Sequence, residues 1–370
     1  MGTTIVMTTA IPAAATDAAV ADLIDRVRRT RRVLNPWADD SARGIPSQQL
    51  DALLEYWADG YDWRVHEGRI RSFPWVVTNS GALRSIHQRS ANPDATAVLL
   101  LHGWPDSVLR FERVLPLLGD FHVVAPALPG FPFSPPLDTA MSAQQIATLV
   151  AEAMSQLGYD RYVVSGGDVG GIVAEFLAAE HPGRVTALHL TNVAAAHAAT
   201  VDPATLPADA IEYLGTIGRW RGTDAGFIAE QSTRPSTLIA SLGDSPAGLL
   251  AWVGEKLLDW SDSSDGRVAF DRDELLTWVS AYWFTGTIGT SFSTYVTPSR
   301  LPSMVEIPTL VSAFADDIIP APRSFAEQFA DVRDFVEHEA GGHFASWEHP
   351  NAYAADLRRA AALSATTPVE

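Results

Sequence analysis

The sequence predicts an α/β fold, in which a mostly parallel β-sheet is covered by helices on both faces. From residue 97 onward, short apolar runs alternate with helical segments, which is typical of strands buried on both sides. Within this region, the run RYVVSGGDVGG over residues 161–171 passes from a β-branched strand through small residues to one polar residue. The chain then continues as a helix. Glycines suit such a turn because they tolerate tight backbone angles.

Composition sets limits on the function. The chain has 370 residues, of which 47% are hydrophobic and 19% charged, so it can bury a sizeable core. The net charge of -18 argues against nucleic acid or an anionic membrane surface as a partner. The absence of cysteine excludes disulfides, thiolate catalysis and cysteine-bound metals. No apolar run reaches the roughly 18 residues of a membrane span, so we expect a cytoplasmic protein, and a homodimer is compatible with the sequence.

Residues 1–95 differ from the α/β pattern, and we predict that they form an N-terminal extension. Residues 17–34 place apolar side chains on one face, which indicates an amphipathic helix. A second helix is predicted over residues 47–57, with Ser47 as its N-cap. Residues 71–89 alternate around Ser80-Gly81, which is typical of a β-hairpin.

The α/β pattern itself is interrupted once. Residues 196–300 are helical and aromatic, and we predict that they form a cap inserted after the sixth strand, between core segments 96–195 and 301–370. A helix is also expected near residues 322–331. The predicted core strands are 97–101, 122–126, 162–164, 185–190, 308–314 and 334–339.

Asp168 stands at the centre of the glycine-rich turn. A strand that ends in a sharp turn with one polar residue, followed by a helix, is the nucleophile elbow of the α/β-hydrolase fold. A dinucleotide-binding GxGxxG motif is disfavoured, because Asp168 would occupy its third position. From this turn alone, a glycine-rich turn with an incidental surface aspartate is an equally good interpretation.

The loop LHGWPDS over residues 101–107 follows the first core strand. In α/β-hydrolases this loop supplies one amide of the oxyanion hole, and the residue after the nucleophile supplies the other. These amides would belong to Trp104 and Val169. A strand-end turn with a packed tryptophan is the alternative interpretation of this loop.

Two later stretches complete the pattern. Asp316-Asp317 follows the strand over 308–314, where the acid of a triad usually stands, and His343 follows a pair of glycines after the last strand. Nucleophile, acid and histidine therefore occur in the chain order of α/β-hydrolases. Each signal is weak alone, but together they are specific.

These motifs resemble the epoxide hydrolase family. The resemblance is carried by HGWPDS, GGDVGG, YWFTGTIGTSFSTY, PTLVSAFADD and GGHFASWEHP, and it extends from about residue 17 over nearly the whole chain. The N-terminal SFPWVVTNSGALRSIHQR is similar to the extension of the microsomal and juvenile-hormone types.

The resemblance implies a role for each matching residue. Asp168 would be the nucleophile, His343 the base and Asp317 its orienting acid, with Asp316 as the replacement if the register is shifted by one. Tyr295 would donate a proton to the epoxide oxygen.

The second tyrosine of the family pattern falls on Phe227, which has no hydroxyl. One donor then suffices, or the substrate is unusual, or another group such as Tyr213, Trp220 or Tyr282 helps. We expect the substrate pocket to be lined by Phe227, Trp220, Tyr282 and Trp283.

The resemblance implies hydrolysis of an apolar or aromatic epoxide to a vicinal diol through an ester on Asp168. A carboxylate suits this reaction, because with a reference pKa of about 3.9 it is already ionised at neutral pH. No cofactor or metal is required. A role in detoxification or natural-product biosynthesis is compatible with this chemistry.

Three rival functions remain open at this point. A haloalkane dehalogenase would use the same scaffold, but it often has a tryptophan directly after the nucleophile, where this chain has Val169; Trp104 could still bind a halide. A serine esterase would need Ser165 as nucleophile, with Val163 where the elbow requires a small residue. A non-catalytic ligand-binding homologue is the third.

Overall fold

The computed structural model describes residues 11–364 and contains one eight-stranded sheet. Its strand order is β1-β2-β4-β3-β5-β6-β7-β8, and every pairing from β4 to β8 is parallel. The strands are β1 (Trp75–Thr78), β2 (Leu83–Gln88), β3 (Ala97–Leu101), β4 (His122–Ala127), β5 (Tyr162–Gly166), β6 (Val185–Leu190), β7 (Val305–Phe314) and β8 (Ala330–His338).

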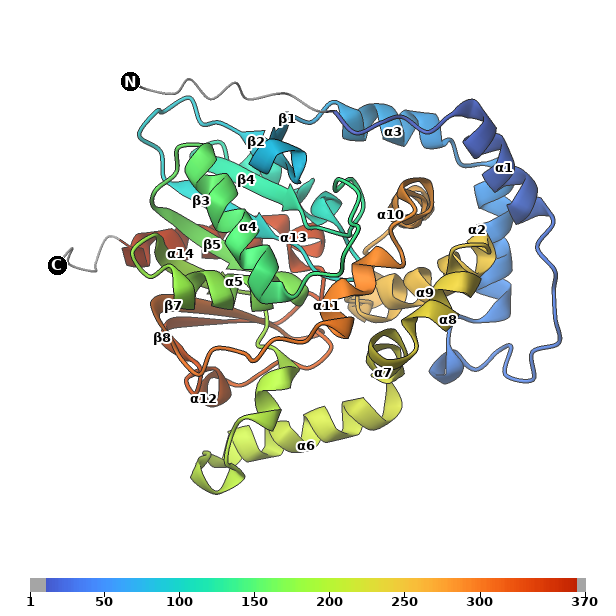
Figure 1. Ribbon diagram of the computed structural model, residues 1–370. Helices are drawn as coiled ribbons and strands as arrows, with labels where there is room; N and C mark the ends of the chain where they lie inside the picture. Colours follow the sequence, from blue (N-terminus) through green and yellow to red (C-terminus); the bar gives the residue numbers. More distant parts are fainter. Residues whose placement is uncertain (1–10, 365–370) are drawn as a thin grey trace.

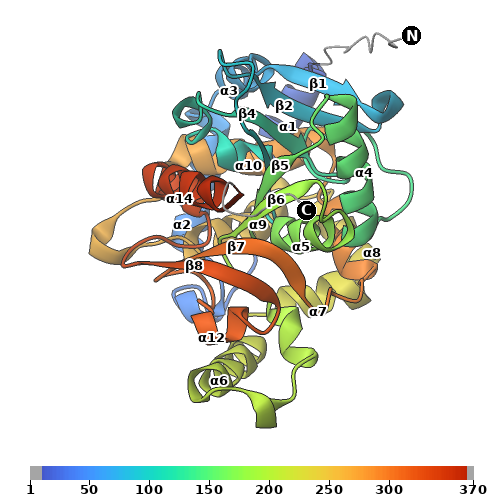
Figure 2. The same cartoon turned by 90° about the vertical axis from the view of Figure 1, so that its left-hand side faces the viewer.

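Helices cover both faces of this sheet, as the sequence predicted. Helices α4 (Ala143–Gln156) and α5 (Val169–Glu180) lie on one side, and α14 (Pro350–Leu363) lies on the other (Figure 2). All five residues of the central strand β3 are buried. This double cover explains why the core strands are continuously apolar.

The last strand corrects one expectation. The helix expected near residues 322–331 is only the short α12 (Arg323–Ala326), and β8 begins at Ala330. Ala330 and Val332 pair with β7 opposite Val305 and Thr309. Because these positions belong to the ladder, the helix ends before them.

The predicted N-terminal extension contributes to the same sheet. Its hairpin, β1 and β2, is antiparallel and adds to β4, with Ile86 opposite Ala125. The turn between the two strands lies at residues 79–81, as the alternation around Ser80-Gly81 predicts.

The helices of the extension differ from the prediction in three details. Helix α1 (Asp17–Arg28) ends before residue 34, because its last buried apolar residue is Val27. Helix α2 (Ser47–Asp59) starts with Ser47 as its first residue, so Pro46 is the N-cap. Helix α3 (Trp63–Arg71) was not predicted, since its only buried apolar side chains are Trp63 and Ile70.

The segment predicted to form a cap consists of helices between β6 and β7, which lie beside one end of the sheet (Figure 1). The extension holds the cap from outside: Trp57 Nε1 donates to Ser280 Oγ at 3.1 Å, and the Tyr56 hydroxyl donates to Asp273 at 2.8 Å. The cap helices are α6 (Ala208–Thr223), α7 (Gly226–Thr233), α8 (Pro235–Leu242), α9 (Pro246–Asp259), α10 (Arg272–Thr285) and α11 (Ser293–Val296).

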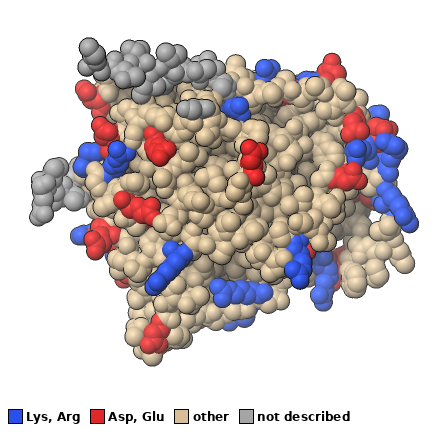
Figure 3. Space-filling view, viewed as in Figure 1, with Lys and Arg blue, Asp and Glu red and all other residues tan. Residues whose placement is uncertain are grey.

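One face of the molecule is shown in Figure 3, with acidic and basic side chains coloured. On the face shown in Figure 3, charged side chains of both signs lie mainly toward the edges, and no continuous basic area is visible. Within residues 11–364, none of the helices combines the length and the apolar character needed to cross a membrane.

Candidate active site

Asp168 sits on the sharp turn between β5 and α5. Its backbone has φ 53° and ψ -131°, a conformation that is strained for a residue with a side chain. The surrounding glycines make the turn possible. A Cβ atom at Gly170 would lie 2.2 Å from the Leu101 carbonyl oxygen, and one at Gly103 would lie 2.5 Å from the Asp168 side chain.

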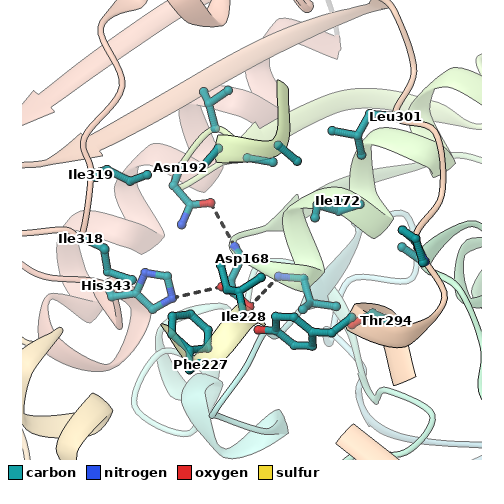
Figure 4. Close-up of a pocket in the computed structure, with 18 of the residues that line it drawn as sticks. Asp168, Ile172, Asn192, Phe227, Ile228, Thr294, Leu301, Ile318, Ile319 and His343 are labelled. Atoms are coloured by element: carbon teal, nitrogen blue, oxygen red, sulfur yellow. Dashed lines mark hydrogen bonds and ion pairs between the residues drawn. The ribbon is translucent and has the colours of Figure 1, made fainter. Parts of the chain in front are cut away.

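The two oxygens of the Asp168 carboxylate have different surroundings. Oδ1 accepts hydrogen bonds from the backbone amides of Trp104 at 2.8 Å and Val169 at 2.7 Å. Oδ2 lies 3.7 Å from His343 Nε2. The two amides predicted to form an oxyanion hole therefore converge on one oxygen. The other oxygen faces the imidazole, and a dashed line joins Asp168 and His343 in Figure 4. The Trp104-Pro105 peptide bond is cis.

His343 is oriented by Asp317. Its Nδ1 lies 2.7 Å from Asp317 Oδ1, which also accepts the Ile318 amide. With Nδ1 bound to a carboxylate, the imidazole presents Nε2 toward Asp168. Asp316 is exposed and its side chain interacts with Asp262 instead, so Asp317 is the aspartate that contacts His343.

Burial and the neighbouring charges shift the pKa of Asp168 and the pKa of His343. Burial raises the pKa of Asp168, although His343 and the amides of Trp104 and Val169 oppose that change. Burial alone would lower the pKa of His343, but Asp317 and then Asp168 outweigh it, so the pKa of His343 is raised. Asp168 and His343 thus stabilise each other in their charged forms.

A cavity of about 320 Å³ opens beside Asp168 and His343, bounded by core loops and the cap. Most of its lining is apolar, and among the described residues it contains no lysine or arginine. Figure 4 shows Ile318 and Ile319 near His343, with Phe227 below Asp168. The predicted residues that line this cavity are Asp168, Val169, Trp220, Phe227, Tyr295, Asp317 and His343.

Comparison with known proteins shows the family and the fold of this chain. Residues 8–111 match the family model described as the epoxide hydrolase N terminus, and residues 96–350 match the alpha/beta hydrolase fold. An enantioselective mutant of the Aspergillus niger epoxide hydrolase is 31% identical, with a TM-score of 0.87 and 97% of each chain covered. The chain belongs to the epoxide hydrolase family.

Two further relatives of this epoxide hydrolase are animal proteins. Epoxide hydrolase 1 of Sus scrofa is 28% identical over 93% of this chain and 86% of its own length. The crystal structure of the juvenile hormone epoxide hydrolase of Bombyx mori has a TM-score of 0.82 at 24% identity, with 97% of this chain and 96% of that chain covered. At 24% identity, the similarity to the Bombyx mori structure supports the fold alone.

Tyr295 is the one tyrosine that lines the cavity among the described residues. Burial, followed by the charge of Asp168, raises the pKa of Tyr295 well above its usual range, so its hydroxyl keeps its proton. Phe227 stacks on Trp104 with ring centroids 5.3 Å apart, and its ring is 6.3 Å from that of Tyr295. Phe227 thus fills the space beside Tyr295 without adding a hydroxyl.

Of the three groups considered as substitute donors, two are already engaged. The Tyr213 hydroxyl donates to the Ile319 carbonyl at 3.0 Å, and the Tyr282 hydroxyl donates to the Asp106 carbonyl at 2.9 Å. Trp220 lines the cavity, and its buried Nε1 has no hydrogen-bond partner.

Two predicted pocket residues lie elsewhere. Tyr282 and Trp283 line a separate cavity of about 480 Å³, which also contacts α8, α9 and the loop around Leu137. Because Tyr282 is fixed to Asp106 through its hydroxyl, this end of α10 packs behind the site instead of facing it. Trp104 also contributes its amide and not its ring, which packs against Trp260 and Phe292.

The structure bears on the rival nucleophile and reveals a residue that the motifs did not single out. Ser165 is fully buried, and its hydroxyl is bound to His189 Nδ1 at 2.8 Å and to the Tyr353 hydroxyl at 2.6 Å, so it has no route to a substrate. Asn192 Oδ1 accepts the Asp168 amide at 3.0 Å. Its only sequence signal is its place just after the strand β6.

Within residues 11–364, no three histidine, aspartate or glutamate side chains are grouped as metal ligands. The chemical groups of the site are two carboxylates, those of Asp168 and Asp317, together with an imidazole, a phenol and two amides.

Proposed function

We propose that this epoxide hydrolase opens an uncharged, apolar epoxide to a vicinal diol through an ester on Asp168. The observation that supports the proposal is that the two oxygens of the Asp168 carboxylate have different contacts. Oδ1 is held by two amides, while Oδ2 is 3.7 Å from His343 at the wall of the cavity. This is the arrangement needed for attack by one oxygen and charge stabilisation on the other.

In the first step, Oδ2 of Asp168 attacks a ring carbon of the epoxide. The new bond joins Oδ2 to carbon, and the strained carbon–oxygen bond breaks. The ring oxygen takes a proton from the Tyr295 hydroxyl. Because the pKa of Tyr295 is raised by burial, the phenolate is unfavourable and the phenol is restored by the proton released in the next step.

In the second step, His343 takes a proton from water, and the resulting hydroxide attacks the carbonyl carbon of the Asp168 ester. Charge develops on Oδ1, where the Trp104 and Val169 amides already point. The acyl–oxygen bond breaks, and the diol leaves with Oδ2 after taking the proton from His343. The proton that the attacking hydroxide brings to the new Asp168 carboxyl group restores the Tyr295 phenol, and Asp168 is again a carboxylate. One water and one epoxide therefore give one diol.

The lining of the cavity limits the substrate. Apart from Asp168, Asp317 and His343, the lining side chains are uncharged, and most are aliphatic or aromatic. A charged group on the substrate that lies away from Asp168, Asp317 and His343 would lose its hydration without gaining a partner. The volume of about 320 Å³ suits a small molecule such as an aryl or alkyl epoxide.

A single turnover in oxygen-18 water tests the mechanism, with enzyme in excess over styrene oxide. The diol should contain no label, because its new oxygen comes from Asp168, and the label should appear in the Asp168 peptide by mass spectrometry. Labelled diol would mean direct attack by water and would overturn the proposal.

The His343→Ala variant gives a second test of the same mechanism. It should form the ester but fail to hydrolyse it, so the Asp168 peptide should gain the mass of the substrate. Release of halide from chloroalkanes, without turnover of any epoxide, would instead support the dehalogenase.

A further inference from the structure

Arg110 is a buried arginine that joins two parts of the site. It lies in the 3₁₀-helical turn Val108–Phe111 and is 3% exposed. Its Nη1 contacts Asp106 Oδ2 at 2.6 Å, and its Nη2 donates to the backbone carbonyl of His343 at 2.6 Å. One planar guanidinium therefore binds a carboxylate and the base residue's own main chain.

Asp106 extends this connection to the oxyanion loop. Its Oδ1 accepts the Gly103 amide at 2.7 Å, and the next amide along the chain, that of Trp104, holds Asp168 Oδ1. His102 Nε2 accepts the Leu128 amide, so the proton of His102 is on Nδ1, 3.4 Å from Asp106. Burial would raise the pKa of Asp106, but Arg110 and His102 outweigh it and hold the pKa below its usual value.

The backbone around His343 is held on every side. The His343 amide donates to the Trp260 carbonyl at 2.7 Å, and the amides of Gly342 and Phe344 donate to Glu348 at 3.2 and 2.9 Å. Arg110 supplies the contact to the His343 carbonyl. The position of the imidazole therefore depends on this loop, and Arg110 ties the loop to the segment that carries the oxyanion amide.

We propose that Arg110 is a positioning residue. Through its contacts with Asp106 and the His343 carbonyl, it keeps the Trp104 amide and the His343 imidazole in the relative positions that hydrolysis of the ester requires. This inference rests on the two-step function proposed above. Both groups act in the same step, since His343 delivers the water while the Trp104 amide receives the charge. Attack by Asp168 on the epoxide needs no base. Loss of Arg110 should consequently slow the second step more than the first.

The test compares Arg110→Met with Arg110→Lys in single-turnover experiments on styrene oxide, following the mass of the Asp168 peptide over time. In Arg110→Met, ester formation should stay within about 3-fold of wild type, while ester decay should slow on the order of 10- to 100-fold, the range expected for a small displacement of catalytic groups. Arg110→Lys should recover part of the decay rate, because it keeps the charge but cannot form both contacts.

Arg113→Met is the matched control. Arg113 also binds a backbone carbonyl, that of Trp347 at 3.0 Å, and the carboxylate of Glu274, but it contacts neither the His343 loop nor Asp106. It should form and hydrolyse the ester at wild-type rates. If Arg110→Met unfolds because Asp106 is left unpaired, the double variant Asp106→Asn/Arg110→Met removes that charge and should show the same slow decay.

The outcomes separate this inference from the mechanism on which it rests. Equal slowing of both steps, or unchanged ester decay in the folded Arg110 variants, would overturn the positioning role while leaving the covalent mechanism intact. If no ester forms in the Arg110 variants and none forms in His343→Ala, the covalent mechanism is overturned, and the proposed role of Arg110 is overturned with it.

Discussion

The adjacent residues Asp316 and Asp317 differ in their contact with His343. Asp317 contacts His343 Nδ1 at 2.7 Å, whereas the exposed Asp316 interacts with Asp262. The sequence motif narrows the acid to two candidates and cannot separate them, because the choice depends on how the loop after β7 turns.

Substitution of Asp317 should therefore impair the enzyme, whereas substitution of Asp316 should not. Asp317→Asn should reduce kcat on the order of 10⁴-fold by allowing the wrong tautomer of His343. It should also move the acidic limb of the pH profile to lower pH, since Asp317 raises the pKa of His343 and its loss lets the imidazole stay neutral in more acidic solution. Steady-state kinetics from pH 5 to 9 measure both effects, and Asp316→Asn should change neither.

Tyr295 and Phe227 give the second residue-scale prediction. Tyr295→Phe should reduce the rate of ester formation on the order of 10²-fold or more, because the cavity has no second phenol among the described residues. Phe227→Tyr should restore part of this rate in the Tyr295→Phe background, as its ring lies 6.3 Å from that of residue 295. Stopped-flow measurement of ester formation checks both, and a mild loss in Tyr295→Phe would implicate another donor such as Trp220.

At the scale of elements, the elbow depends on how closely α5 approaches β3. A Cβ atom at Gly170 would lie 2.2 Å from the Leu101 carbonyl oxygen and 2.5 Å from that of His102. Gly170→Ala should destabilise the fold by about 1–3 kcal/mol, the usual cost of overpacking, and abolish most activity by displacing Asp168.

Gly222→Ala in α6 is the control for Gly170→Ala, because a Cβ atom there would meet nothing within 4 Å. It should be neutral or stabilising, since alanine favours a helix over glycine. Urea denaturation of both variants measures the difference. Equal stability in the two would mean that the close approach of α5 is not needed.

The sequence predicts some elements better than others for physical reasons. The core strands are well predicted, because strands buried on two sides are apolar throughout. The residues at their ends were expected to lie together because parallel strands end at the same edge of a sheet. Helix α3 was missed because it is only 9 residues long and buries just two apolar side chains, Trp63 and Ile70. Tyr282 and Trp283 were expected in the substrate pocket, but they line a separate cavity, and the Tyr282 hydroxyl donates to the Asp106 carbonyl.

On the scale of the whole molecule, a polar network crosses the interior of the sheet. His189 is fully buried between Ser165 and Ser312, with Nε2 2.9 Å from Ser312 Oγ, and Ser312 binds Asp356. Burial lowers the pKa of His189 to about 4, with Asp356 opposing the change. The folded protein therefore keeps this imidazole neutral where an unfolded chain would protonate it.

This network predicts acid sensitivity. Between pH 6.5 and 4 the unfolded chain binds a proton at His189 that the folded protein does not, so stability should fall as the pH falls, by on the order of 3 kcal/mol. His189→Gln should flatten the pH dependence in this window. Chemical denaturation at pH 7 and pH 4.5 tests this, and an unchanged dependence in the variant would assign the acid sensitivity to other groups.

The two hydrogen bonds to Asp168 Oδ1 have a consequence over many catalytic cycles. If these bonds prevent the Asp168 carboxylate from rotating and exchanging its two oxygens, Oδ1 is never released from the protein. The other oxygen leaves with each product molecule and is replaced by an oxygen from water. In water labelled with oxygen-18, the Asp168 peptide would then gain one oxygen-18 atom and never a second, however many turnovers the enzyme completes.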